Sequence, residues 1–340
     1  MKKRITAIIM AMLCLLLTAC SGTQSGGTAN DVSDSNAVVR DERYIELSGD
    51  ENDSFVAEED CYTEGDDVVM FFQKGVTVTG DMLAVTERVM SDLCETTGLT
   101  FDKNHDPESY MDCLGMYFEN GKFADINSDM TKVNVIIANL EDTLQYASDN
   151  NAILESADYD YEQTYYQTIY HELTHVIQMR NGVSLGSVMD EGYATYIADK
   201  AQRAQKMQAW NTVQYYFPYS YDDSVVSLGE NGFKHYFVDD RDANYQYGIR
   251  FITFLYDVYG DEMFGKILKE ATEKGFDSGY DPEDANTITE DTEELKIIIK
   301  SQTDEDVFEK FADWYADNWS VKGAEYVKYM ESIGNDMTGF

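Results

Sequence analysis

The sequence predicts an α+β fold, in which a small mixed β-sheet is followed by a mostly helical second half. Short runs rich in β-branched and aromatic residues, which favour strands, occur before residue 155. Residues 162–180 contain no Gly or Pro and place apolar residues at three and four spacing, as an amphipathic helix does. Similar helical patterns fill most of the chain after residue 187. Strands that precede helices, rather than alternating with them, are typical of the α+β class.

The first 58 residues differ in composition from the rest of the chain. Three basic residues, at positions 2–4, precede an apolar run at 5–17 and the sequence Leu-Thr-Ala-Cys that ends at Cys20. This pattern resembles a bacterial lipoprotein signal. The resemblance implies that residues 1–19 are removed, that Cys20 is lipidated, and that the protein is held outside the cytoplasm on the cell membrane. An uncleaved signal anchor is the alternative. Residues 20–58 are rich in Ser, Gly, Asn and Asp, and we expect them to form a flexible linker that carries the lipidated cysteine.

We expect the folded part to consist of two subdomains. Residues 59–186 form an α+β subdomain that includes the helix at 162–180, and residues 187–340 form a helical subdomain. In the first, we expect strands at 68–72, 76–78, 132–138 and 152–154, and a helix at 82–97 with Asp81 as its N-cap. In the second, we expect helices at 187–204, 245–259, 262–274, 307–319 and 324–333, an irregular aromatic-rich excursion at 208–240, and a loop through the acidic run 277–294.

Composition narrows the function. The chain has 340 residues with 43% hydrophobic content, which is ample for a sizeable core. Its 25 basic and 64 acidic residues give a net charge of 25 − 64 = −39, which argues against a nucleic-acid partner. We expect a monomer. After Cys14 and Cys20, only Cys61, Cys94 and Cys113 remain. One disulfide among these three is compatible with the sequence, which does not choose the pair.

The motif His171-Glu172-Leu173-Thr174-His175 lies within the expected helix at 162–180 and uses two of the four histidines in the chain. Residues four apart lie on one face of a helix, so both imidazoles can reach one metal ion while Glu172 lies beside it. A catalytic zinc site has three protein ligands and an open position. Glu191, 16 residues after His175 and on the next helix, is the expected third ligand, with Asp190 as the alternative.

HELTHVIQ followed by DEGYATYIAD resembles the gluzincin metallopeptidases, the peptidase MA-like group with a HExxH…E pattern. The resemblance implies a zincin-like fold, a Zn²⁺ ion held by His171, His175 and Glu191, and Glu172 as general base. The segment from Tyr245 to Phe251 is similar to a later helix of the aminopeptidase-like branch, in which a tyrosine three residues before a glycine stabilises the tetrahedral intermediate. By this alignment the tyrosine is Tyr245. Tyr247 and His235 are the alternatives.

The function expected from these residues is hydrolysis of peptide bonds in a peptide or protein substrate by a zinc-activated water. A different function is that of a surface binding lipoprotein that retains the metallopeptidase fold and a zinc site but is catalytically inactive. A third is a structural zinc site, which would need a fourth protein ligand. The sequence does not distinguish internal from terminal cleavage, nor does it name the substrate.

Overall fold

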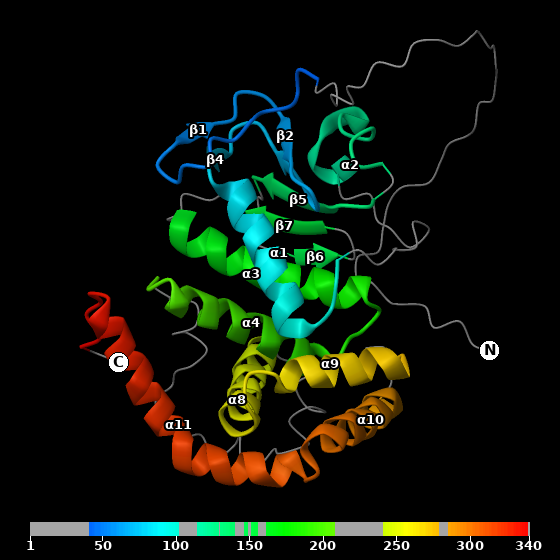
Figure 1. Ribbon diagram of the computed structural model, residues 1–340, viewed down its shortest axis with the longest axis vertical. Helices are drawn as coiled ribbons and strands as arrows, with labels where there is room; N and C mark the ends of the chain where they lie inside the picture. The colour runs from blue at the N-terminus through cyan, green and yellow to red at the C-terminus, as the bar shows by residue number, and fades with distance from the viewer. Residues whose placement is uncertain are drawn as a thin grey trace, which may run out of the picture.

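A computed structural model describes residues 41–101, 114–128, 130–139, 146–148, 151–155, 161–207, 241–278 and 285–338. The sheet forms one layer (Figure 1). The helices α1 (Met82–Thr97) and α3 (Tyr161–Arg180) form the next layer, and the helices that follow α3 form the last. The predicted α+β class, with a small mixed sheet packed on the HELTH helix and a mostly helical second half, is confirmed.

The main sheet has five strands in the order β2-β3-β5-β7-β6. The strands are β2 (Cys61–Glu64), β3 (Val68–Phe72), β5 (Val133–Ala138), β6 (Tyr146–Ser148) and β7 (Asn151–Glu155). β3, β5 and β7 run parallel, with Met70 opposite Val135 and Val135 opposite Ala152, whereas β2 and β6 are antiparallel edge strands. β3 and β5 are buried on both faces, as their continuous apolar sequences predict. A separate pair joins β1 (Ser54–Val56) and β4 (Thr77–Thr79).

Helices cover both faces of the main sheet. Alternate residues of β3 and β5, such as Met70 and Val135, pack with α1 (Met82–Thr97) and α3 (Tyr161–Arg180) in the main hydrophobic core. Phe71 and Ile136 point to the other face, where they meet a smaller cluster around α2 (Leu114–Tyr117) and the short 3₁₀ turn η2 (Glu119–Gly121). The period of two in each strand therefore divides the apolar residues between the two cores.

The helical half packs beneath α3 (Figure 1). It contains α4 (Ser187–Ala204), α8 (Arg241–Tyr259), α9 (Met263–Lys274), α10 (Ala285–Thr303) and α11 (Val307–Ser332). α8 lies between α4 and α11. Phe251 and Phe254 of α8 have ring centroids 5.2 Å and 5.5 Å from the ring of Phe311 on α11, which ties these two helices together.

Two helix predictions in this half were wrong. The acidic run 277–294, expected to be a loop, enters α10 at Ala285. Leu295, Ile298 and Ile299 are buried at three and four spacing, so an apolar stripe towards the C-terminal end stabilises a helix whose second and third turns carry the acidic residues of the run. The two helices expected at 307–319 and 324–333 form one continuous helix, α11, which passes through the interior residue Gly323.

The N-terminal boundary also differs from expectation. Within the expected linker, Tyr44 forms a β-bridge with Tyr62 and β1 spans Ser54–Val56, so ordered contacts begin well before residue 59. Among the described residues Cys61 is a free, buried thiol, and burial raises its pKa to about 11. The signal segment with Cys20, the aromatic-rich stretch 208–240 and Cys113 lie outside the described residues. Within those residues, no helix has both the length and the apolar composition needed to cross a membrane.

Candidate metal centre

His171 and His175 lie one turn apart on the same face of α3. The opposite stripe of this helix, which includes Leu173 and Val176, is completely buried in the main core and fixes the direction in which the histidines point. The helix is fixed lengthwise at its C-terminal end, where the guanidinium of Arg180 donates to the carbonyl of Phe101 (2.5 Å) and to that of Lys132 (2.9 Å).

Hydrogen bonds to α1 also hold α3 in place. The Tyr170 hydroxyl donates to Asp92 Oδ2 at 2.5 Å, and the hydroxyls of Thr86 and Tyr165 lie 2.6 Å apart. A charged acceptor strengthens the first of these bonds. Rotation of α3 about its own axis would break both bonds, so the histidine face is held in one orientation.

A tight turn returns the chain from α3 to α4. Gly182, two residues past the end of α3, has φ +62°, the left-handed conformation that glycine adopts without steric cost and that commonly ends a helix. Asp190, in the first turn of α4, then binds three groups that precede it. It accepts hydrogen bonds from Gln178 Nε2 (2.8 Å), Ser184 Oγ (2.7 Å) and the backbone N–H of Leu185 (3.1 Å). Asp190 is therefore an anchor between α3 and α4, and not the third ligand that we had considered as an alternative to Glu191.

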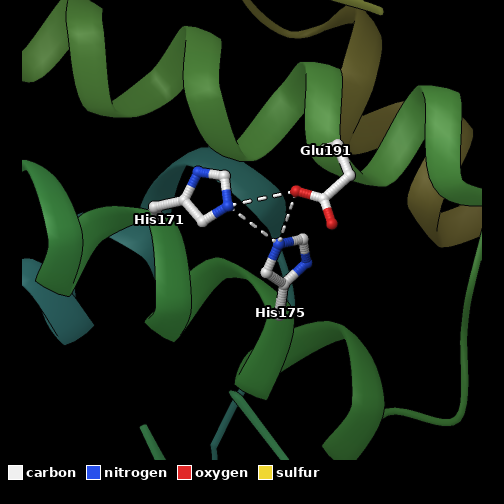
Figure 2. Close-up of side chains that lie close together, drawn as sticks. All are labelled: His171, His175 and Glu191. Carbon is white, nitrogen blue, oxygen red and sulfur yellow. Dashed lines mark hydrogen bonds and ion pairs between the residues drawn. The ribbon is translucent and has the colours of Figure 1, made fainter. Parts of the chain in front are cut away.

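Glu191 points from α4 towards the two histidines, and the three side chains converge on one point (Figure 2). Glu191 Oε2 lies 3.2 Å from His171 Nε2 and 3.4 Å from His175 Nε2, and the two Nε2 atoms lie 3.2 Å apart. Zinc–ligand distances of about 2.0–2.1 Å in a tetrahedral arrangement place neighbouring ligand atoms roughly 3.3–3.4 Å apart. The spacing of these three atoms fits a zinc ion.

Electrostatics make the cluster a cation site. Burial by itself would lower the pKa of His175, but the negative charges of Glu191, Glu172 and Asp190 outweigh it and raise the pKa to about 9. Burial would likewise raise the pKa of Glu191, yet the charge of His175 and hydrogen bonds with both histidines hold it well below its usual range. A positive charge is thus strongly favoured at the point where the three side chains meet.

The cluster is reached by solvent on one side. The side chains of His171 and His175 are each 17% exposed and that of Glu191 is 26% exposed. Among the described residues, no fourth His, Cys, Asp or Glu joins these three. Glu172, only 6% exposed, follows His171 on α3 and lies close enough to raise the pKa of His175. Within the described part of the chain, the cluster therefore offers three possible metal ligands, is partly exposed and has a carboxylate beside it.

The two candidate tyrosines of α8, Tyr245 and Tyr247, lie in different surroundings. The ring of Tyr245, near the start of α8, stacks on His171 with centroids 6.0 Å apart and an interplanar angle of 28°. Tyr247 is 1% exposed, and its ring meets that of Phe311 edge-on at 5.8 Å, away from the histidines. Tyr245 is therefore the tyrosine brought to the site. His235 lies outside the described residues.

Comparisons with known proteins give weak likenesses. No family model and no curated protein matches the chain. Among solved structures, the chain is similar to the ZmpB metallopeptidase from Clostridium perfringens, with 14% identity and a TM-score of 0.43, over 75% of this chain and 46% of that one. It is also similar to a functionally unknown conserved protein from Bacillus anthracis str. Ames, with 10% identity and a TM-score of 0.44, over 76% and 51% of the two chains. The chain spans about half the length of these proteins.

Sequence reasoning missed two features of the site. One is the role of Asp190 as an anchor between α3 and α4. Its hydrogen-bond donors include Gln178 and Ser184, and no sequence pattern predicts that they pair with it. The other is a pair of glycines, Gly192 and Gly248, at which α4 and α8 touch. An isolated glycine inside a helical pattern signals close packing, so this second feature had a visible cue in the sequence.

Proposed function

We propose that the protein is a zinc-dependent metallopeptidase that hydrolyses peptide bonds. The observation that carries this proposal is the convergence of His171 Nε2, His175 Nε2 and Glu191 Oε2 to within 3.2–3.4 Å of one another. The open side of the cluster and the neighbouring carboxylate of Glu172 support a catalytic site. The substrate is a peptide or protein.

The chemistry follows from the groups around the cluster. Held by His171, His175 and Glu191, zinc would supply Lewis-acid polarisation of a water and of the scissile carbonyl. Glu172 would accept a proton from the attacking water and later deliver it to the leaving amine. Tyr245 would donate a hydrogen bond to the carbonyl oxygen as negative charge develops there, a contribution often worth about 3–4 kcal/mol. The stacking of its ring on His171 supports this role.

We further propose that the protein acts outside the cytoplasm, held on the membrane by a lipid on Cys20. The basic residues at 2–4, the apolar run 5–17 and the small residues before Cys20 support this proposal. The high negative charge supports a partner other than nucleic acid.

The substitution Glu172→Gln tests the proposed reaction. It keeps the shape of the side chain but removes the base, so we expect cleavage of a diverse peptide mixture to fall about 10²–10⁴-fold while one zinc per chain stays bound. The matched control is Glu273→Gln, the same change at an exposed position of α9, which should leave cleavage unchanged. Cleavage is measured by mass spectrometry, with a chelator-treated sample as the background.

The same experiment distinguishes the proposed peptidase from a catalytically inactive binding lipoprotein. Full cleavage by the Glu172→Gln protein would rule out the proposed mechanism. A wild-type protein that binds one zinc per chain and cleaves no peptide in the mixture would instead support the inactive binding lipoprotein.

A further inference from the structure

Two helices near the metal centre, α4 and α8, approach each other through their backbones alone. α4 and α8 meet where Gly192 faces Gly248. A Cβ atom on Gly248 would lie 2.8 Å from the Cα of Gly192 and closer still to the carbonyl oxygen of Val188. A Cβ atom on Gly192 would lie 2.5 Å from the Cα of Gly248. Carbon atoms in contact prefer separations of about 3.5–4.0 Å, so any side chain at either position would force the helices apart.

Each glycine is next to a residue of the site. Glu191 immediately precedes Gly192 on α4. Tyr245 lies three residues before Gly248, and residues three apart share a face of a helix. The separation of α4 and α8 at the glycines therefore sets the distance between the helix that carries Glu191 and the helix that carries Tyr245.

Neither helix is free to move away on its own. α4 is tied to α3 by the hydrogen bond from Gln178 to Asp190, and to the turn between the two helices by the bonds from Ser184 and Leu185 to the same carboxylate. α8 is backed by α11, where the ring of Phe251 stacks on Phe308 at 5.5 Å and meets Phe311 at 5.2 Å. A methyl group inserted at the glycine contact would thus displace Glu191, Tyr245 or both.

We propose that Gly192 and Gly248 are positioning residues, which hold Tyr245 against His171 and Glu191 at the metal by allowing α4 and α8 to touch. This inference rests on the proposed function for its catalytic consequence. Displacement of a catalytic group by about 1 Å costs roughly 10²-fold in rate. Gly192, next to a ligand, acts mainly on metal affinity, and Gly248, one turn from Tyr245, acts mainly on kcat.

The test compares Gly192→Ala and Gly248→Ala with Gly265→Ala in the full chain. Gly265 on α9 makes a similar close approach to α1, where an added Cβ would lie 2.9 Å from the carbonyl oxygen of Thr96. Neither α9 nor α1 carries a residue of the candidate site. For each protein we would measure unfolding in urea, zinc affinity by competition with a chelator, and kcat and KM for peptide cleavage. Gly248→Ala should lower kcat about 10–100-fold with KM within about threefold. Gly192→Ala should weaken zinc binding about tenfold or more. Gly265→Ala should lower stability alone.

A second readout does not depend on catalysis. With 3-fluorotyrosine at position 245, zinc binding to the adjacent His171 should shift the fluorine resonance in the wild-type protein. This shift should shrink in Gly248→Ala and persist in Gly265→Ala. If the wild-type protein cleaves no peptide, the proposed function fails, while the fluorine shift and the zinc affinities still decide the inference.

Phe311→Leu changes the contact between α8 and α11, on the side of α8 away from the glycines. It keeps the inference testable if Gly248→Ala does not fold. It removes one of the rings that back α8 but leaves the stacking of Phe251 on Phe308 and the glycine contact in place, so kcat should stay within about threefold of the wild type. A kcat that falls as far in Phe311→Leu as Tyr245 displacement predicts, about 10–100-fold, would assign the positioning to the aromatic cluster and overturn the inference. A Gly248→Ala protein with unchanged kcat and an unchanged fluorine shift would also overturn the inference. The same holds if kcat or the fluorine shift falls as far in Gly265→Ala as in Gly248→Ala.

Discussion

The helix α4 makes two contacts of opposite character. Against α3 it presents polar side chains, and His171, His175 and Glu191 meet in a partly exposed cluster. Against α8 it presents bare backbone at Gly192 and Gly248, where no side chain fits. The first contact supplies the donor atoms, and the second determines how closely Tyr245 approaches them. A metal centre built on packed helices thus depends on its ligands and also on positions between the helices that carry no side chain.

The largest effect should come from breaking the polar contact itself. Glu191→Gln removes the charged ligand and should weaken zinc binding about 10³-fold, since a neutral amide replaces a carboxylate that faces two histidines. Asp190→Asn is the matched change one residue earlier. It disrupts acceptors for Gln178 and Ser184, so it should lower the free energy of unfolding by about 1–3 kcal/mol and weaken zinc binding about tenfold. Calorimetric titration with zinc and urea unfolding measure the two quantities. Equal losses of affinity in both variants would contradict the separate assignments of ligand and anchor.

A smaller effect, on kcat, should come from changing Tyr245 on α8. Tyr245→Phe removes only a hydroxyl and should lower kcat about 10²-fold while zinc affinity stays the same. Tyr247→Phe, two residues away on another face of α8, should leave kcat within about twofold, because its ring packs against Phe311 rather than against the histidines. Steady-state kinetics on one peptide substrate compare the two. The same loss from both changes would mean that α8 acts through its packing and not through the Tyr245 hydroxyl.

The smallest effect is a pH dependence of the metal-free protein. The pKa of His175 is raised to about 9 in the folded state, chiefly by the charge of Glu191 acting against burial. A raised pKa means that the protonated histidine stabilises the fold below its unfolded pKa of about 6.5, and that this contribution is lost as pH rises towards 9. The metal-free protein should therefore lose stability between about pH 6.5 and 9, and His175→Gln should flatten the dependence. Urea unfolding at several pH values gives the curve. A stability that rises over this range would contradict the charge pairing.

Much of this account was accessible from the sequence because it depends on local periodicity. Four-residue spacing places His171 and His175 on one helix face whatever the tertiary context, and the short return through Gly182 brings Glu191 back to them. What escaped depends on contacts between distant segments. The meeting of Gly192 with Gly248 is set by how α4 and α8 cross. The helix α10 was missed because the acidic residues of its second and third turns dominate the run that leads into the buried stripe at Leu295 and Ile298.

The central claim is that His171, His175 and Glu191 hold one zinc ion and leave a side of it open. Zinc-edge X-ray absorption on the wild-type protein, loaded with one equivalent of metal, tests this most directly. The account predicts a single tight site per chain, with two imidazole nitrogens and oxygen ligands at about 2.0–2.1 Å, no sulfur, and loss of one imidazole in His175→Ala. Sulfur ligation, a spectrum unchanged by that substitution, or no tight site would contradict it.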